Sequence, residues 1–170
     1  FASAVTDKIQ VHDALMSFAM RAAHKARQQG QLAGAVHIFM RTDPHNAGAA
    51  QKAVSESASF PRPTADSRQV TEVVMRLFER IWCDGYGWRK AGVMLLDLAA
   101  PKTVQPSLFD DPSPPREGLM AAMDQINARF GRGSAGLGLA RKGGQWRMRQ
   151  DQLSPHYTTR WCDLPKARIQ

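Results

Sequence analysis

The sequence has little cysteine and no long run of apolar residues. Its two cysteines, Cys83 and Cys162, lie in no CxxC or Cys/His spacing, which argues against a disulfide scaffold or a structural zinc site. No apolar stretch approaches the roughly 20 residues that cross a bilayer, and the N-terminus lacks a signal-peptide pattern. We therefore expect a cytoplasmic protein without membrane contact. Because the chain begins with Phe1 and not Met, we also expect a fragment of something longer.

A recognisable active site is also missing. The five histidines never fall in a metal-ligand spacing with Cys, Asp or Glu, and no set of nucleophile, base and orienting group can be assembled. Asp110 and Asp111 are adjacent but flanked by prolines, and Asp97 is an isolated acid. We expect no catalytic residue, metal ligand or cofactor within this chain.

Acidic residues are in the minority, with 15 Asp and Glu against 23 Lys and Arg, a formal net charge of +8. Residues 1–102 hold 13 basic against 9 acidic side chains, residues 103–115 hold none against 2, and residues 116–170 hold 10 against 4. Basic segments on both sides of an acidic one favour a polyanionic partner, above all nucleic acid. Charge alone leaves open that the protein is simply basic.

Hydrophobic periodicity predicts two elements early in the chain. Residues 11–29 place apolar side chains at steps of three and four, which is typical of an amphipathic helix, and Gly30 is its expected C-cap. Residues 33–41 alternate between apolar and other side chains, which predicts a strand. Residues 52–60 predict a further strand, ended by the prolines at 61 and 63.

The next segments complete an α+β fold. Asp66 is an expected N-cap for a helix that continues to Ile81, and residues 89–98 predict a buried strand. If residues 1–9 are also extended, the order is β-α-β-β-α-β. This is a ferredoxin-like order, in which two helices cover one face of a four-stranded sheet and leave the other face free.

A proline-rich acidic segment divides the chain into three predicted parts. Residues 1–102 form the first domain, residues 103–115 are a linker, and residues 116–170 are a small α+β unit. The last part begins with a helix over 116–130, whose predicted apolar face consists of Leu119, Met123, Ile126 and Phe130.

The linker contains a candidate docking peptide. Gln105, Ser107, Leu108 and Phe109 fit the pattern Gln-x-[Ser/Asp]-Leu-Phe, followed by acidic and proline residues. Such an extended peptide can insert its Leu and Phe into an apolar pocket while the Gln amide hydrogen-bonds nearby. The alternative is that Leu108 and Phe109 fold back on the sheet.

Three stretches carry a resemblance to a known family. They are LFERIWCDGYGWRKAGVMLLDL at 77–98, QPSLFDD at 105–111 and DQLSPHYTTRWCDLP at 151–165. Together they resemble the C-terminal portion of the UmuC family, the Y-family translesion DNA polymerases of bacteria. The segments LSPHYTTRW and KAGVML are its most specific parts, and the resemblance spans essentially the whole chain.

The resemblance implies roles for all three parts. Residues 1–102 correspond to the little finger, whose sheet grips the DNA backbone; residues 105–109 to the sliding-clamp motif; and residues 116–170 to the UmuC-specific C-terminal region. Pro106 stands where the clamp motif more often has Leu, so a weaker clamp contact is expected. The parent is implied to be a bacterial, cytoplasmic, Mg-dependent polymerase in SOS mutagenesis, working with a processed UmuD dimer and RecA. Its metal-binding carboxylates belong to regions outside this chain.

The candidate DNA-backbone contacts are basic residues on or beside the predicted strands. They are Arg41, Lys52, Arg62, Arg89 and Lys90. Two other readings stay open: a protein-interaction module whose charge only keeps it soluble, and an RNA-binding sheet. Against the RNA-binding reading, the predicted strands lack a pair of aromatic residues on a common face.

Overall fold

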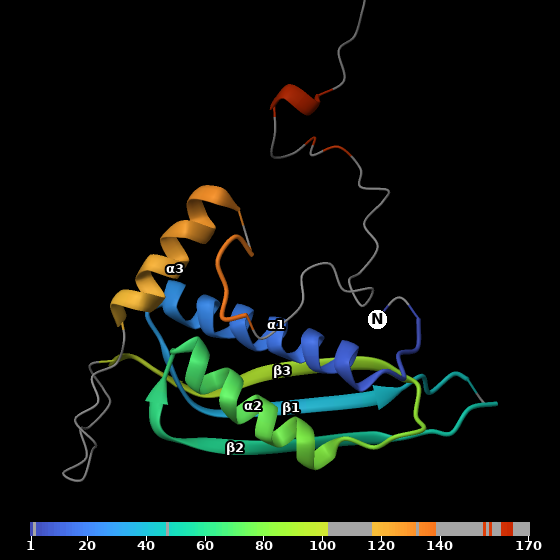
Figure 1. Cartoon of the computed structure of the whole chain (residues 1–170). Helices are drawn as coiled ribbons and strands as arrows, with labels where there is room; N and C mark the ends of the chain where they lie inside the picture. Colours follow the sequence, from blue (N-terminus) through green and yellow to red (C-terminus); the bar gives the residue numbers. More distant parts are fainter. Residues whose placement is uncertain are drawn as a thin grey trace, which may run out of the picture.

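In a computed structural model of the protein, the described residues are 1, 3–46, 48–101, 117–131, 133–138, 155, 157 and 161–164. The elements in chain order are α1 (Lys8–Gln28), β1 (Leu32–Thr42), β2 (Ala53–Thr64), α2 (Ser67–Ile81), β3 (Trp88–Ala99), α3 (Glu117–Phe130) and the 3-10 turn η2 (Trp161–Asp163). The fold is α+β, as predicted (Figure 1).

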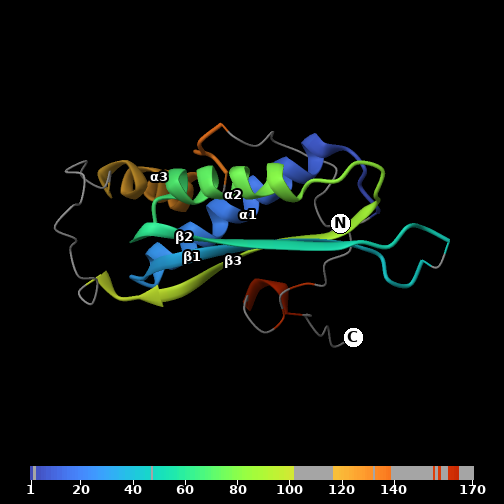
Figure 2. The ribbon, with the colours of Figure 1, turned by 90° about the horizontal axis from the view of Figure 1, so that it is seen from below.

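The three strands form one antiparallel sheet in the order β2-β1-β3, with β1 in the centre. Helices α1 and α2 lie side by side on one face of this sheet (Figures 1 and 2). None of α1, α2 and α3 covers the opposite face, which we call the open face. The expected arrangement of two helices on one side of a sheet is thus confirmed.

The core lies between β1 and the two helices. Val36, Ile38 and Met40 alternate along β1 and are completely or almost completely buried, as a strand with one covered face requires. Their partners in the core from α1 and α2 include Val11, Leu15, Ala19, Val70, Val74, Leu77 and Phe78.

Both ends of α1 follow local sequence rules. The Asp7 carboxylate caps the start by accepting a hydrogen bond from the Ile9 amide at 2.9 Å, so the helix begins three residues earlier than expected. At the other end Gly30 has a φ of 62°, and the amides of Gly30 and Gln31 donate to Arg27 and Ala26 at 2.9 Å each. This is the left-handed C-terminal motif that favours glycine, and it confirms Gly30 at the predicted helix end.

The expected first strand is reduced to a single bridge. Val5 pairs with Trp88 through two backbone hydrogen bonds of 2.9 Å, and α1 starts only three residues later. The predicted strand at residues 1–9 is thus present only as this bridge, and its last two residues, Lys8 and Ile9, belong to α1 instead.

The prolines at 61 and 63 do not end the second predicted strand. β2 continues through both of them to Thr64. It is an edge strand, and a proline is tolerated there because an outward-facing position needs no amide hydrogen. The pairing between β1 and β2 changes register in this stretch, where Ala35 is opposite Ser59 but Ala33 is opposite Thr64.

The strand predicted as buried, β3, is buried on one face only. Ala91, Val93 and Leu95 pack against the core, whereas Met94 and Leu96 are 46% and 38% exposed. A continuous apolar run usually marks a strand covered on both faces, and here no described helix covers the second face.

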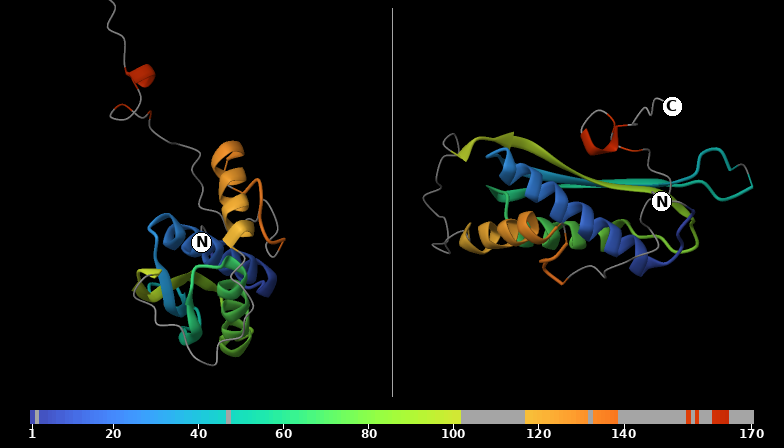
Figure 3. Two further views of the ribbon diagram at one scale, coloured as in Figure 1. Left: turned by 90° about the vertical axis from the view of Figure 1, so that its left-hand side faces the viewer. Right: turned by 90° about the horizontal axis from the view of Figure 1, so that it is seen from above.

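Helix α3 docks beside the C-terminal end of α1 (Figures 1 and 3). Asp124 accepts hydrogen bonds of 2.7 Å from both Nε and Nη2 of Arg27, and its carboxylate lies 2.8 Å from Nδ1 of His24. Met120 is the buried apolar residue of α3, while Phe130 is 68% exposed. The predicted apolar face is therefore largely not the docked one, because its residues Leu119, Ile126 and Phe130 are all exposed.

Candidate nucleic-acid interface

Strand register determines which side chains share the open face. His37 lies between Ser57 and Met94, Phe39 lies between Ser55 and Gly92, and Arg41 lies between Ala53 and Lys90. Directly paired residues of antiparallel strands point to the same side. Since Val36, Ile38 and Met40 face the helices, these nine residues face away from them.

Arg41 and Lys90 are brought together by this register. They are direct cross-strand partners, both are exposed, and neither forms an ion pair with another described residue. Like charges placed opposite each other destabilise a sheet. The register therefore places two positive charges side by side on the open face.

The other three predicted contacts do not join this pair. Lys52 lies 4.8 Å from the centre of the Tyr86 ring, and a hydrogen bond with the Cys83 side chain is the main reason that its pKa is raised. The Arg89 guanidinium lies 3.9 Å from the carboxylate of Asp43. Arg62 is exposed in the irregular part of β2.

A row of serines borders the basic pair, and sequence reasoning missed it. Ser55, Ser57 and Ser59 are exposed and pair with alternate residues of β1 on the open face. Hydroxyl groups are common donors to phosphate oxygens. The alternation in SESAS was the available signal, but on its own it predicts only a strand with one polar face.

The Phe39 ring lies against β3 on the open face. A Cβ atom added at Gly92 would come within 2.5 Å of the Phe39 ring, so the ring rests on the bare backbone of β3. Phe39 also stacks on His37, with ring centres 6.3 Å apart. Among the described strand residues of this face it is the one Phe, Tyr or Trp, so no aromatic pair of the RNA-binding kind is present there.

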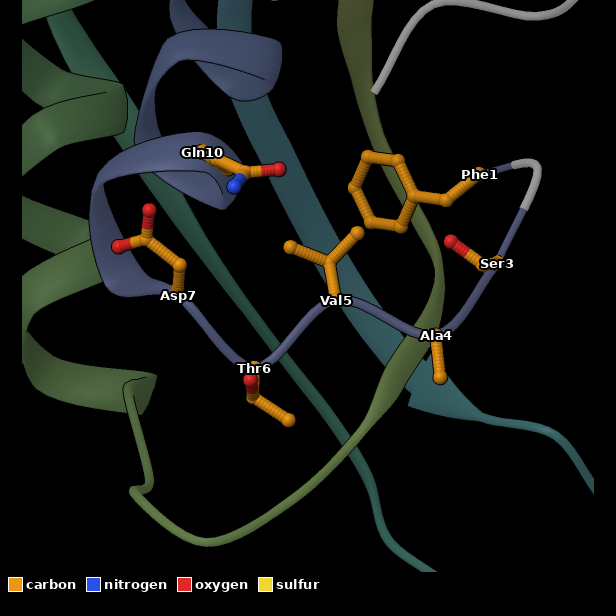
Figure 4. Close-up of a pocket in the computed structure, with 7 residues that line it drawn as sticks. All are labelled: Phe1, Ser3, Ala4, Val5, Thr6, Asp7 and Gln10. Atoms are coloured by element: carbon orange, nitrogen blue, oxygen red, sulfur yellow. The ribbon is translucent and has the colours of Figure 1, made fainter. Parts of the chain in front are cut away.

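Two of the hollows on the described surface lie near residues discussed above. A shallow groove between β1 and β2 is lined by His37, Phe39, Arg41, Ser55 and their neighbours, and it runs along the polar half of the open face. The other hollow is formed by the first residues of the chain and Gln10 (Figure 4). Its one acid, Asp7, already caps α1.

The described residues contain no group of three or more His, Cys, Asp or Glu side chains placed to hold a metal ion. Within the same part of the chain, no helix has the length and apolar character needed to span a membrane. The predicted docking peptide, Gln105, Ser107, Leu108 and Phe109, lies outside the described residues.

Each of the two parts of the chain matches a known protein family. Residues 1–108 match the impB/mucB/samB family C-terminal domain, and residues 117–167 match a domain of unknown function, DUF4113.

Individual relatives agree with the family match. The chain is 37% identical to Protein ImpB of Salmonella typhimurium and 36% identical to Protein UmuC of Salmonella typhimurium strain LT2, each over 174 residues and 99% of the chain. It is 36% identical to Protein MucB of Escherichia coli over the full chain. In each case the chain spans 40% of the relative's length. The chain therefore belongs to the impB/mucB/samB family and is a UmuC-family C-terminal region.

Proposed function

We propose that this chain is the DNA-binding and clamp-binding C-terminal part of an error-prone translesion DNA polymerase, and that it is not itself catalytic. The open face of the sheet contacts the DNA backbone. The observation that carries this proposal is the Arg41–Lys90 pair, in which two exposed cations face each other on an uncovered sheet.

The surroundings of the pair support the same function. Exposed hydroxyl groups of Ser55 and Ser57 lie beside it, and the paired positions of the open face from His37 to Arg41 carry no acidic side chain. Contacts from lysine, arginine and serine to phosphate oxygens fix a protein on DNA without reading its sequence. Binding of this kind weakens steeply as salt is added, because each phosphate contact releases counterions.

The test compares two charge-matched double variants of the 170-residue chain. Arg41→Ala with Lys90→Ala removes two cations from the open face, and Lys25→Ala with Arg76→Ala removes two exposed cations from α1 and α2. Affinity for a primed duplex is measured by fluorescence anisotropy over a series of salt concentrations. We expect the open-face variant to flatten the plot of log affinity against log salt by about two.

The helix variant should keep the original slope, because its cations lie on the far side of the sheet. Equal slopes for the two variants, or no affinity of the unmodified chain for DNA at low salt, would overturn the proposal.

A protein-binding sheet is the second candidate, and one observation favours it. Met94 and Leu96 place exposed apolar surface on the same face, opposite His37 and Ala35 of β1. A protein partner would bury these two side chains and show weak salt dependence. Replacing both by Ser separates the candidates, because a DNA site that depends on Arg41 and Lys90 should lose little affinity.

The clamp contact rests on the sequence pattern alone. We infer that Leu108 and Phe109 enter an apolar pocket of a bacterial sliding clamp and that Gln105 and Ser107 position the peptide. The variant Leu108→Ala with Phe109→Ala should abolish clamp binding and leave the folded domain and its DNA affinity unchanged. Unaltered clamp binding would contradict the motif.

The activity of the whole protein follows from its family and stays a proposal, because the chain spans 40% of the length of its relatives. We propose that the parent takes part in DNA repair and mutagenesis as a Mg-dependent polymerase in the bacterial cytoplasm. A processed UmuD dimer and RecA are the partners expected of it.

A further inference from the structure

Helix α3 carries an apolar seam that its docking leaves open. The α3 seam consists of four residues at steps of four, three and four along the helix: Leu119, Met123, Ile126 and Phe130. This is the spacing with which one helix packs along another. All four side chains are at least partly exposed, Phe130 by 68%, because the contact with α1 uses Asp124 on the neighbouring side. The seam is therefore available to a further apolar partner.

The chain that follows α3 turns back along the helix (Figure 1). The Asn127 side chain holds this turn. Its Oδ1 accepts hydrogen bonds from the amides of Gly133 and Ala135 at 3.0 and 3.1 Å, and its Nδ2 donates to the Ala135 carbonyl at 3.0 Å. The Ser134 hydroxyl donates to the Phe130 carbonyl at 3.0 Å. The rest of the chain thus starts from the flank of α3.

Near its end the chain presents three large side chains to water. Tyr157, Trp161 and Leu164 are 48%, 90% and 39% exposed. They follow one another at steps of four and three, and the 3-10 turn η2 begins at Trp161. Side chains at this spacing anchor helical peptides in apolar grooves, and tryptophan and tyrosine are prominent among the residues that dominate binding energy. We call these three residues the C-terminal anchors.

The α3 seam and the C-terminal anchors belong to the same unit of the chain. Both lie within residues 117–167, which match a single family domain. Exposed apolar surface of this extent is a mark of a binding site, and here one small unit has two such surfaces. Packing one against the other removes both from water.

The chain is long enough for this contact and favours it over a contact between copies. Tyr157 is 22 residues after Ala135, and an extended chain spans about 3.3 Å per residue. The seam covers eleven residue steps of helix, about 16 Å. Because both partners lie in one chain, their effective concentration is of roughly millimolar order. A second copy at micromolar concentration competes poorly with that.

We propose that the α3 seam is the docking site of the chain's own C-terminal anchors. Trp161, the most exposed of the three, packs against Ile126 and Phe130 at the end of the seam nearest the Asn127 turn. The contact closes residues 117–167 into one unit that remains attached to α1. The DNA and clamp contacts proposed above involve none of these residues, so the inference goes beyond that function and does not depend on it.

Paramagnetic labelling of the 170-residue chain tests the contact. Cys162 is exposed and adjoins Trp161, and Cys83→Ser leaves it as the one thiol of the chain. A nitroxide on Cys162 should weaken the NMR amide signals of α3, and reduction of the nitroxide should restore them. Residues 43–46 connect β1 to β2 at the far end of the sheet from α3 (Figure 1), and their signals should keep their intensity.

Two double variants of the labelled chain separate a specific contact from chance encounters. Ile126→Ser with Phe130→Ser alters the seam and should remove the weakening of the α3 signals. Ala121→Ser with Ala128→Ser changes two exposed positions on the opposite side of the same helix and should leave the weakening as it is.

Full-intensity α3 signals in the labelled chain would overturn the proposal. Signals that weaken only when a nitroxide-labelled copy is mixed with an isotopically enriched, unlabelled copy would overturn it as well, because the seam would then bind a second copy. Equal weakening in the two double variants would also contradict it, since the label would lie near α3 without using the seam. Each of these results leaves the proposed DNA and clamp contacts untouched.

Discussion

The two faces of β1 differ although their residues alternate along a single strand. Val36, Ile38 and Met40 are buried against α1 and α2, whereas His37, Phe39 and Arg41 point to the open face. The buried set contributes to stability through apolar area removed from water. The other set is held in place by the same backbone but is under no comparable packing constraint. Stability and binding can therefore be changed independently in this strand.

The largest expected effect is a loss of stability on the covered face. Ile38→Ala removes a completely buried side chain and should lower the free energy of unfolding by about 2–5 kcal/mol. Urea unfolding followed by circular dichroism measures it. The adjacent His37→Ala, on the open face, should change stability by no more than about 0.5 kcal/mol. Equal losses for the two neighbours would break the distinction between the faces.

The next effect concerns the ionic attachment of α3. Asp124→Ala removes the charged partner of Arg27 and leaves it the Ala65 carbonyl and the Ser67 hydroxyl. The loss should weaken the docking of α3 by about 1–3 kcal/mol. Hydrogen exchange of the α3 amides is the measurement, with exposed Glu72→Ala in α2 as the charge-matched control. The strand amides of β1 should remain protected, because the sheet core does not depend on this contact.

The same attachment should respond to acid. The hydrogen bonds from Arg27 hold the pKa of the Asp124 carboxyl below its usual value against the opposing effect of burial, and His24 adds to them. Because the folded-state pKa is the lower one, the stabilisation is complete above the unfolded pKa of about 4 and is lost as the pH falls through the folded pKa. Protection of the α3 amides should decline below about pH 4. In Asp124→Asn this decline should be absent.

The smallest effect is a local one on the open face. Gly92→Val places a side chain where the Phe39 ring now lies. The ring must then turn away, and its stacking contact with His37 is lost. We expect a few-fold loss of DNA affinity with stability changed by less than about 1 kcal/mol. In the Phe39→Ala background the same substitution should have no further effect, and a double-mutant cycle of affinities measures this coupling.

Local patterns were enough to predict most elements, and non-local pairing accounts for what they missed. The alternation of Val36, Ile38 and Met40 predicted β1, and Gly30 predicted the end of α1. That Arg41 meets Lys90 depends on the register of strands nearly 50 residues apart, which no local pattern encodes. Arg89 and Lys52 were predicted by the same criterion as these two, a position on or beside a predicted strand. In the fold, however, Arg89 lies beside the Asp43 carboxylate and Lys52 lies over the Tyr86 ring.

Pro61 and Pro63 lie in the edge strand of a sheet that also has an uncovered face. An exposed edge is a template on which the strand of another chain can be added, and a proline interrupts that template because it has no amide hydrogen to donate. The two prolines therefore interrupt strand addition along the end of β2 in which they lie.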